Sequence, residues 1–189
     1  MVRHLSSLRH QGRAWPGDSA KGVAHVCLHD VRTRRLSCGS LAGNAGGQGR
    51  HHSIHDPTAR LALERAATAA VERLERPECQ KVLTDFRDAA GHTIQERLDG
   101  LGETPRQYLA RLTFREALDS RCHDDARLAF TYRNQSVVFV CGTRLWQAYR
   151  RDPRYVEALV IHEMLHTLGL GENPPASLEI HAGILKRCW

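Results

Sequence analysis

The sequence predicts an α+β domain, because capped helix starts flank one pair of short segments rich in β-forming residues. Each helix start joins a residue whose side chain can cap free amides to a proline at the first helical position. These pairs are Asp56-Pro57, Thr104-Pro105 and Asp152-Pro153. The β-rich segments cover residues 128–132 and 137–141. We therefore expect helices around a small sheet, in a domain that spans residues 56–189.

The first half of this domain is predicted to be helical. The first helix opens at Asp56-Pro57 and continues through an alanine-rich stretch that ends before Pro77. Residues 78–86 predict a second, shorter helix. The Thr104-Pro105 pair opens a third, which we expect to continue as far as residue 112.

The period of the apolar residues then changes from helix to strand. The segments 128–132 and 137–141 are separated by a polar turn at residues 133–136, so we expect an antiparallel hairpin. A long helix follows, over residues 153–168. Gly169 ends it, because glycine adopts the left-handed conformation that commonly follows a helix.

Residues 1–55 differ from the rest of the chain in charge and composition. They carry eight Arg or Lys against two Asp, whereas residues 56–189 carry nineteen of each sign. The formal net charge of +6 therefore belongs to this first segment. It also holds eight of the 15 glycines and seven of the 12 histidines. This composition predicts a basic, Gly/His-rich and disordered tail.

Four of the six cysteines lie in the predicted domain, widely spaced. This predicts two disulfides and an exported protein, periplasmic or secreted. We expect Cys141 to pair with Cys188 and Cys79 with Cys122, because Cys141 ends a strand and Cys188 ends the last helix. Residues 1–15 show no apolar signal-peptide core, so the sequence offers no leader in support of export. No apolar run of about 18 residues occurs, so no transmembrane segment is expected.

One motif in the long helix points to metal chemistry. Residues His162 to His166 read His-Glu-Met-Leu-His, an HExxH motif with apolar neighbours on both sides. At about 100° per residue, the two histidines are about 40° apart on one helical face. Two imidazoles at this spacing can bind one tetrahedral Zn²⁺. Glu163 lies at the edge of that face, where it can act as a general base without being a ligand. We therefore predict His162 and His166 as metal ligands and Glu163 as the catalytic residue.

The motif and its surroundings resemble the zincin metallopeptidases. The resemblance is strongest over residues 160–175, which also look like a set of small uncharacterised bacterial HExxH proteins. It implies a zincin-like fold, with a short antiparallel sheet packed on the HExxH helix and an edge strand along the cleft. It also implies zinc-dependent hydrolysis of peptide bonds in a peptide or protein substrate, with Glu163 activating a zinc-bound water.

The resemblance leaves the third zinc ligand open between Glu172, Glu179 and His181. In a metzincin-like site Gly169 allows a sharp turn and Glu172, three residues later, is the ligand, although the Met-turn of that clan is missing here. In a gluzincin-like site the ligand is Glu179, on a last helix that we expect over residues 177–185. We choose Glu172, because glycine favours the tight turn and the loop that places this residue is short.

Two other functions remain as alternatives. A non-catalytic domain could use zinc only to hold its fold, with His162, His166, Glu172 and either Glu179 or His181 as four ligands. The basic tail could instead bind nucleic acid or an anionic surface. The neutral domain carries no recognised nucleic-acid-binding motif, so we expect no specific nucleic-acid partner.

Overall fold

The computed structural model describes residues 26–29, 36–39, 52–123 and 127–189. The chain divides into two units, Met1–Gly46 and Gly47–Trp189. In the first unit, β1 (Val26–His29) and β2 (Leu36–Gly39) pair as antiparallel strands. Most of the tail that we predict to be disordered lies outside the described residues. Within the described ranges, no helix is both long and apolar enough to cross a membrane.

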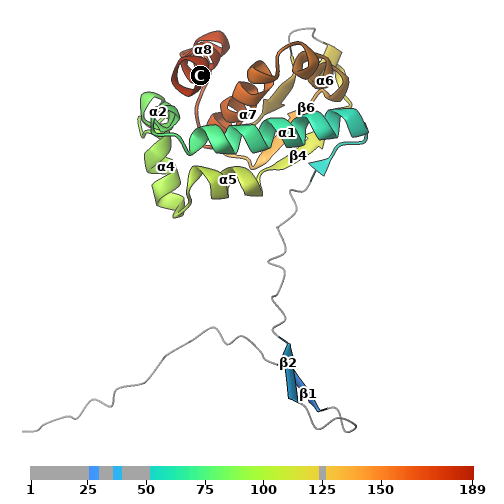
Figure 1. Cartoon of the computed structure of the whole chain (residues 1–189). Helices are drawn as coiled ribbons and strands as arrows, with labels where there is room; N and C mark the ends of the chain where they lie inside the picture. The colour runs from blue at the N-terminus through green and yellow to red at the C-terminus, as the bar shows by residue number, and fades with distance from the viewer. Residues whose placement is uncertain (1–25, 30–35, 40–51, 124–126) are drawn as a thin grey trace, which may run out of the picture. The chain divides into compact units, whose positions relative to one another are not determined.

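The second unit is built around α1 (Pro57–Leu74), which Figure 1 shows lying across the front of the domain. It begins where the sequence predicts, and the Asp56 carboxylate accepts hydrogen bonds from the N–H groups of Thr58 and Ala59. Its buried face is mostly alanine, which lets α6 (Gly142–Arg151) and α7 (Pro153–Thr167) pack closely against it. The buried residues of α1 are Ala59, Ala62, Leu63, Ala66, Ala67, Ala70, Val71 and Leu74.

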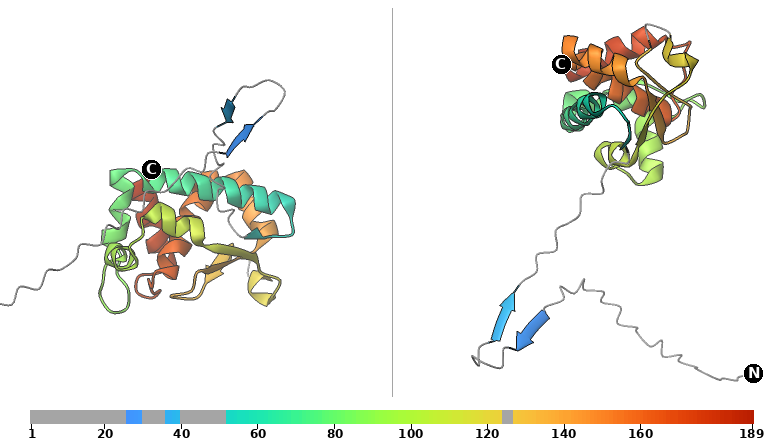
Figure 2. Two further views of the ribbon diagram at one scale, coloured as in Figure 1. Left: turned by 90° about the horizontal axis from the view of Figure 1, so that it is seen from below. Right: turned by 90° about the vertical axis from the view of Figure 1, so that its right-hand side faces the viewer.

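Four short helices follow α1. The segment predicted as one helix over residues 78–86 forms two, α2 (Pro77–Gln80) and α3 (Val82–Asp85). The helix α5 (Pro105–Arg111) begins at the predicted Thr104 cap. The helix α4 (Ile94–Leu101) is an addition to the prediction. In Figures 1 and 2, α2 and α4 lie at one end of the domain, and the sheet and α6 lie at the other.

The sheet of the domain has four strands in the order β3-β4-β6-β5. The strands are β3 (His52–Ser53), β4 (Thr113–Glu116), β5 (Ala129–Thr131) and β6 (Val137–Val140). The predicted hairpin of β5 and β6 is confirmed as antiparallel. However, β4 pairs in parallel with both β3 and β6, so the sheet is mixed and the prediction of an antiparallel sheet is wrong for these pairs. Because the chain turns back through β5 before it forms β6, β6 enters the sheet in the direction of β4.

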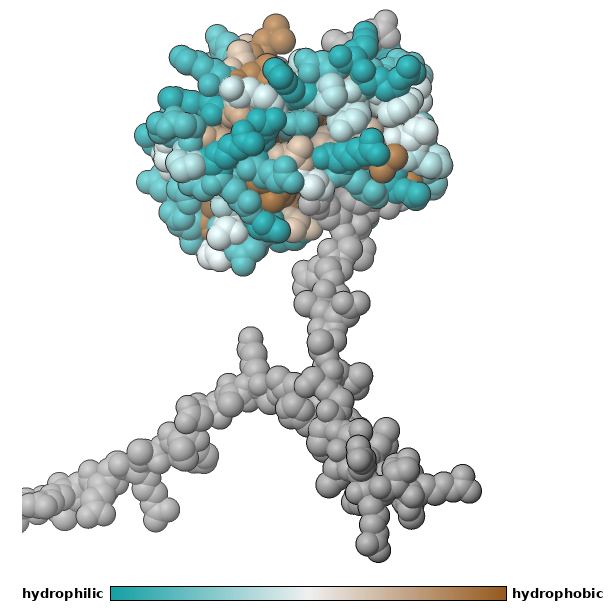
Figure 3. Space-filling model, viewed as in Figure 1, coloured by the Kyte–Doolittle hydropathy of each residue, from teal (hydrophilic) through white to brown (hydrophobic). Residues whose placement is uncertain are grey.

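The core lies between α1, α7 and the sheet. The helix α7 supplies Ile161, Met164 and Leu165, and β4 supplies Phe114, all of them fully buried. The last helix, α8 (Ser177–Cys188), packs against α7, α2 and α3. On the face of the domain drawn in Figure 3, hydrophilic residues cover most of the surface and apolar residues are scattered.

Two disulfides close the domain, with a connectivity different from the one predicted. Cys79 pairs with Cys188, and Cys122 pairs with Cys141. The predicted pairing is wrong because α8 packs on α2, which carries Cys79, and not beside the end of β6. Cys122 belongs to a short 3-10 helix (Ser120–His123) that precedes β5, next to the end of β6. The presence of two disulfides is typical of proteins that fold in an oxidising compartment.

Candidate metal centre

The two histidines of the motif lie on α7, a helix buried on nearly all sides. It begins at Asp152, whose carboxylate accepts hydrogen bonds from the N–H groups of Arg154 and Tyr155. From Val160 to Thr167 every residue is buried, so His162 and His166 are held in one orientation by packing. His162 is only 3% exposed and His166 only 8%.

Three side chains converge at the open edge of this helix. The Nε2 atoms of His162 and His166 are 2.9 Å apart. Glu172 Oε1 lies 3.2 Å from His166 Nε2 and 3.6 Å from His162 Nε2. Ligands of one tetrahedral ion at zinc distances lie about 3.3 Å apart. The three atoms are therefore spaced as they would be around a single metal ion.

The loop after α7 places Glu172. The N–H of Leu170 donates to the Leu165 carbonyl and the N–H of Gly169 to the His166 carbonyl, a pattern that ends a helix at a left-handed residue. Gly169 has a φ of +108°. A Cβ there would lie 3.0 Å from Asn134 Oδ1 and 3.3 Å from Asp88 Cβ. Glycine is therefore required at position 169, because the backbone is left-handed there and because a Cβ would have too little room.

This loop also fixes the ring of His166. The Nδ1 of His166 is 2.8 Å from the Leu170 carbonyl oxygen, so Nδ1–H donates to it. The proton on Nδ1 leaves the lone pair of Nε2 facing His162 and Glu172, which is the tautomer that a metal ligand needs. Leu170 in turn pairs with Asp88 in an isolated antiparallel bridge.

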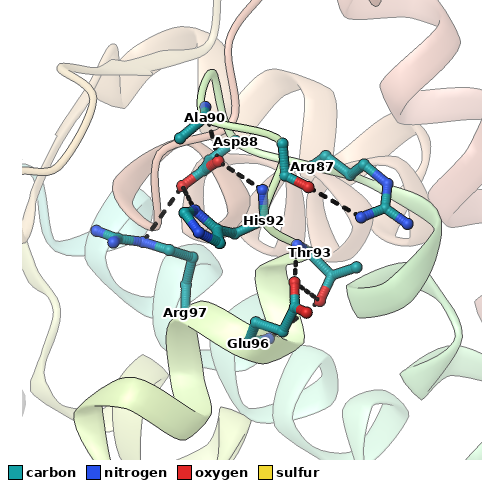
Figure 4. Close-up of polar contacts among 8 residues, drawn as sticks. Arg87, Asp88, Ala90, His92, Thr93, Glu96 and Arg97 are labelled. Carbon is teal, nitrogen blue, oxygen red and sulfur yellow. Dashed lines mark hydrogen bonds and ion pairs between the residues drawn. The ribbon is translucent and has the colours of Figure 1, made fainter.

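The turn that carries Asp88 is held by its own polar contacts, drawn in Figure 4. Asp88 Oδ1 accepts hydrogen bonds from the N–H groups of Ala90 and His92, both 2.9 Å long. Asp88 Oδ2 lies 3.6 Å from Arg97 Nε and 3.5 Å from His92 Nδ1. The Asp88 turn therefore forms an anchored support for Leu170, and through Leu170 for His166.

His162 is buried in its neutral form. Burial, followed by the neighbouring His166 and His181, lowers the pKa of His162 to about 3. Its Nδ1 atom has no hydrogen-bond partner among the residues that the structure describes. Because only a neutral imidazole offers a lone pair, this environment keeps His162 ready to bind a metal.

Glu163 points into the same cleft and is only 5% exposed. Its Oε2 atom is buried and unpartnered within the described part of the chain. Burial, followed by repulsion from Glu172, raises the pKa of Glu163 to about 8. A bound cation would stabilise the charged form of a buried carboxyl group that lies beside a second carboxylate. The donor set of two imidazoles and one carboxylate, with these buried polar atoms around it, fits a divalent metal ion.

The other two candidate ligands lie elsewhere. Glu179 Oε2 accepts a hydrogen bond from the N–H of Ala176, so this carboxylate caps the start of α8. His181 packs against Tyr155 with the two rings tilted by 38° and their centroids 4.1 Å apart, and its ring centroid is 6.1 Å from that of His162. Its buried Nε2 has no partner in the described ranges. Glu172 thus lies with the two histidines in one cluster. Glu179 is not part of this cluster, and His181 lies next to it without belonging to it.

A cleft of about 690 Å³ opens over these residues. One wall is β5, the edge strand of the sheet, with the segments on either side of it. The opposite wall is formed by α7 and the start of α8, including Tyr155, Leu159 and Leu178. The cleft therefore lies between β5, the last strand of the sheet in the described part of the chain, and the histidines.

Comparison with protein-family models, curated proteins and solved structures finds no match to this chain. Function is therefore inferred from the geometry of the site itself. The sequence pointed to His162, Glu163, His166 and Glu172, but not to the contribution of Asp88 and Leu170. Their contribution depends on a pairing between residues 82 positions apart and on a backbone carbonyl, and neither has a sequence signature.

Proposed function

We propose that this protein is a zinc-dependent peptidase with a zincin-like active site. The convergence of His162, His166 and Glu172 beside the buried Glu163, on a cleft with a free strand edge, is the observation that carries the proposal. Bound Zn²⁺ would supply the Lewis acid that polarises the scissile carbonyl and lowers the pKa of water toward about 7. Imidazole and carboxylate ligands suit this ion.

Each residue of the site has its own role in the proposed reaction. His162 and His166 hold the metal through Nε2, with His166 oriented by its Nδ1–H bond to Leu170. Glu172 provides the third ligand from the loop after α7. Glu163 accepts a proton from the attacking water on its carboxylate and passes it to the nitrogen of the leaving amine. Its burial in the cleft strengthens electrostatic interactions with the reacting groups.

The substrate is proposed to bind as an extended peptide along β5. This strand is the edge of the sheet and lines the cleft through Ala129, Phe130 and Thr131. An edge strand presents unpaired N–H and C=O groups, to which an extended peptide adds as a further strand. A peptide bound in this way would carry its scissile bond opposite His162 and His166. The two disulfides support a periplasmic or secreted location, where peptides and proteins are available as substrates.

Glu172 is proposed as the third ligand in preference to Glu179. Gly169 and the short loop place Glu172 within 3.2 Å of His166, whereas the carboxylate of Glu179 is engaged at the start of α8. The arrangement is metzincin-like in the spacing of its ligands. A purely structural zinc site is less well supported, because such sites favour four protein ligands, usually with cysteine, and are closed to solvent.

The test compares wild-type protein with Glu163→Gln. We expect purified wild-type protein to contain one zinc ion by elemental analysis and to cleave casein or a peptide library. Glu163→Gln should keep the zinc and the fold but lose at least about 100-fold in kcat, the contribution typical of a general base. A folded, zinc-loaded Gln variant with full activity would refute this mechanism. Loss of zinc in the same variant would mean that Glu163 is a ligand.

A further inference from the structure

The β5 side of the cleft is lined by three arginines. Arg121 and Arg127 precede β5, Arg133 follows it, and all three line the cleft. The wall also contains the aromatic residues Phe130 and Tyr132. The opposite wall, formed by α7 and α8, contributes histidines, glutamates and apolar side chains. Among the described residues that line the cleft, the three arginines therefore all lie on the side where an extended peptide would bind.

Arg121 is already neutralised. Its Nε lies 3.2 and 3.1 Å from the two carboxylate oxygens of Asp119, and its guanidinium lies 4.2 Å from the centre of the Phe130 ring. It also donates a hydrogen bond to the hydroxyl of Tyr132. These contacts hold Arg121 against the wall, so it contributes little free charge to the cleft.

Arg127 and Arg133 are different, because neither has a hydrogen bond or ion pair with any residue in the described ranges. Both side chains are exposed. Arg133 lies beside the loop of Glu172, since its Nη1 is 3.4 Å from the position that a Cβ on Gly171 would occupy. Arg127 lines the cleft two residues before the start of β5.

Arg127 and Arg133 lie before and after β5 in the sequence. They are six residues apart, so even a fully extended chain would separate them by at most about 20 Å. The negative groups that line the cleft in the described residues are Glu163 and Glu172, which the proposed function assigns to proton transfer and metal binding. Among the described residues, the cleft therefore offers these guanidinium groups no further carboxylate, whereas an incoming peptide can supply one, and guanidinium groups bind carboxylates well.

We propose that Arg127 and Arg133 select peptides that carry carboxylates on both sides of the bound segment, so that the cleft is specific for acidic peptides. The inference rests on the proposed peptidase function for the position of the peptide. The carboxylate can belong to an acidic side chain or to the end of the peptide. Both sources share one chemistry, and the test distinguishes them.

The experiment measures binding and cleavage with three peptides of the same length and apolar centre. One is amidated and has Glu at both flanks, one is amidated and has Gln at both flanks, and one has Gln flanks with a free terminal carboxylate. Binding to zinc-loaded Glu163→Gln protein is measured by fluorescence anisotropy, and cleavage by wild-type protein is measured as kcat/KM. We expect the Glu peptide to bind about tenfold more tightly than the amidated Gln peptide, as two exposed ion pairs would give.

The double variant Arg127→Gln, Arg133→Gln should lose this preference while binding the amidated Gln peptide as before. Arg65→Gln, on the exposed face of α1 and outside the cleft, is the matched control and should keep it. The preference should also shrink in about 0.5 M salt. A gain in affinity with the free terminal carboxylate, in addition to the gain with the Glu flanks, would support the proposal and show that the chain end can supply one of the two carboxylates.

Two results would overturn the inference: equal binding of all three peptides, or a preference that survives in the double variant. Failure of the proposed function would look different. In that case wild-type protein would cleave none of the peptides, while the binding preference and its loss in the double variant would still decide the role of the arginines.

Discussion

Two sides of the same cleft are built in different ways. On one side, α7 and α8 carry the histidines on buried helices that are tied to the rest of the domain. Arg73 of α1 connects them: it donates to the Cys188 carbonyl, lies 4.4 Å from the centre of the Trp189 ring and is 3.7 Å from Glu157. On the other side, β5 is an edge strand of three residues, and Tyr132 and Arg133 after it are exposed.

In the proposed function, the helical side of the cleft holds the metal ligands and the β5 side binds the peptide. Metal ligands must keep their positions within a fraction of an ångström, so they belong on packed elements with supporting contacts. A surface that accepts a peptide needs free hydrogen-bonding groups and unpaired charge, which only an exposed edge can offer. Each side also has its own disulfide, Cys79–Cys188 for the helices and Cys122–Cys141 for the β5 wall. Removing them one at a time tests whether the two sides are independent.

The largest effect on stability is expected from the helical side. The Cys79–Cys188 bond closes a loop with a sequence separation of 109, so replacing both cysteines by alanine should lower the free energy of unfolding by about 5 kcal/mol. Denaturant unfolding of the variant measures this loss. If the two sides are independent, any protein that remains folded should still prefer acidic peptides. If the variant is as stable as wild-type protein but has a different peptide preference, the two sides of the cleft are not independent.

Removing the disulfide of the β5 wall should lower stability less than removing Cys79–Cys188, and it should weaken peptide binding more. Its sequence separation is 19, which corresponds to about 3 kcal/mol. The double alanine variant should loosen the segment that carries Arg121 and leads into β5. We therefore expect KM to rise more than kcat falls, with zinc content unchanged. Loss of zinc from this variant would show that the wall also supports the metal centre.

The smallest effect is expected where the two sides meet, at Gly169. The turn residue Asn134 of the wall lies against this glycine, so Gly169→Ala introduces both a strained backbone and a close contact. We expect a loss of about 1–2 kcal/mol in unfolding free energy, together with weaker zinc binding because the Glu172 loop must shift. Gly100→Ala on α4 is the matched control. It faces open space and should be neutral or slightly stabilising.

The helices of the domain were largely predictable, because their ends depend on local chemistry. The caps at Asp56, Thr104 and Asp152 lie where the sequence placed them. The start of α4, which is absent from the predicted helices, has the same local basis, a capping box formed by Thr93 and Glu96. The helix α6 has no side-chain cap at Cys141 and therefore gave no start signal. The last helix begins at Ser177, as predicted, but extends to Cys188, three residues beyond the predicted end.

Features that depend on distant parts of the chain were not predictable in the same way. The parallel pairing of β4 with β6 and the pairing of the cysteines both depend on how elements pack, which local patterns do not encode. In the candidate site, too, some features follow from local sequence and others depend on distant parts of the chain. The spacing of His162, Glu163 and His166 follows from helix geometry alone. The approach of Glu172 and the support of His166 by Leu170 and Asp88 required the folded loop.

If His162, His166 and Glu172 form one metal site, zinc affinity must depend on all three side chains. A competition titration with a chromophoric chelator should compare wild-type protein with Glu172→Ala and Glu179→Ala. Loss of a direct ligand should weaken zinc binding by more than the roughly 10–100-fold typical of residues that only support a ligand. We predict such a loss for Glu172→Ala and near wild-type affinity for Glu179→Ala, whose carboxylate caps α8. Wild-type affinity in Glu172→Ala together with a large loss in Glu179→Ala would contradict the account.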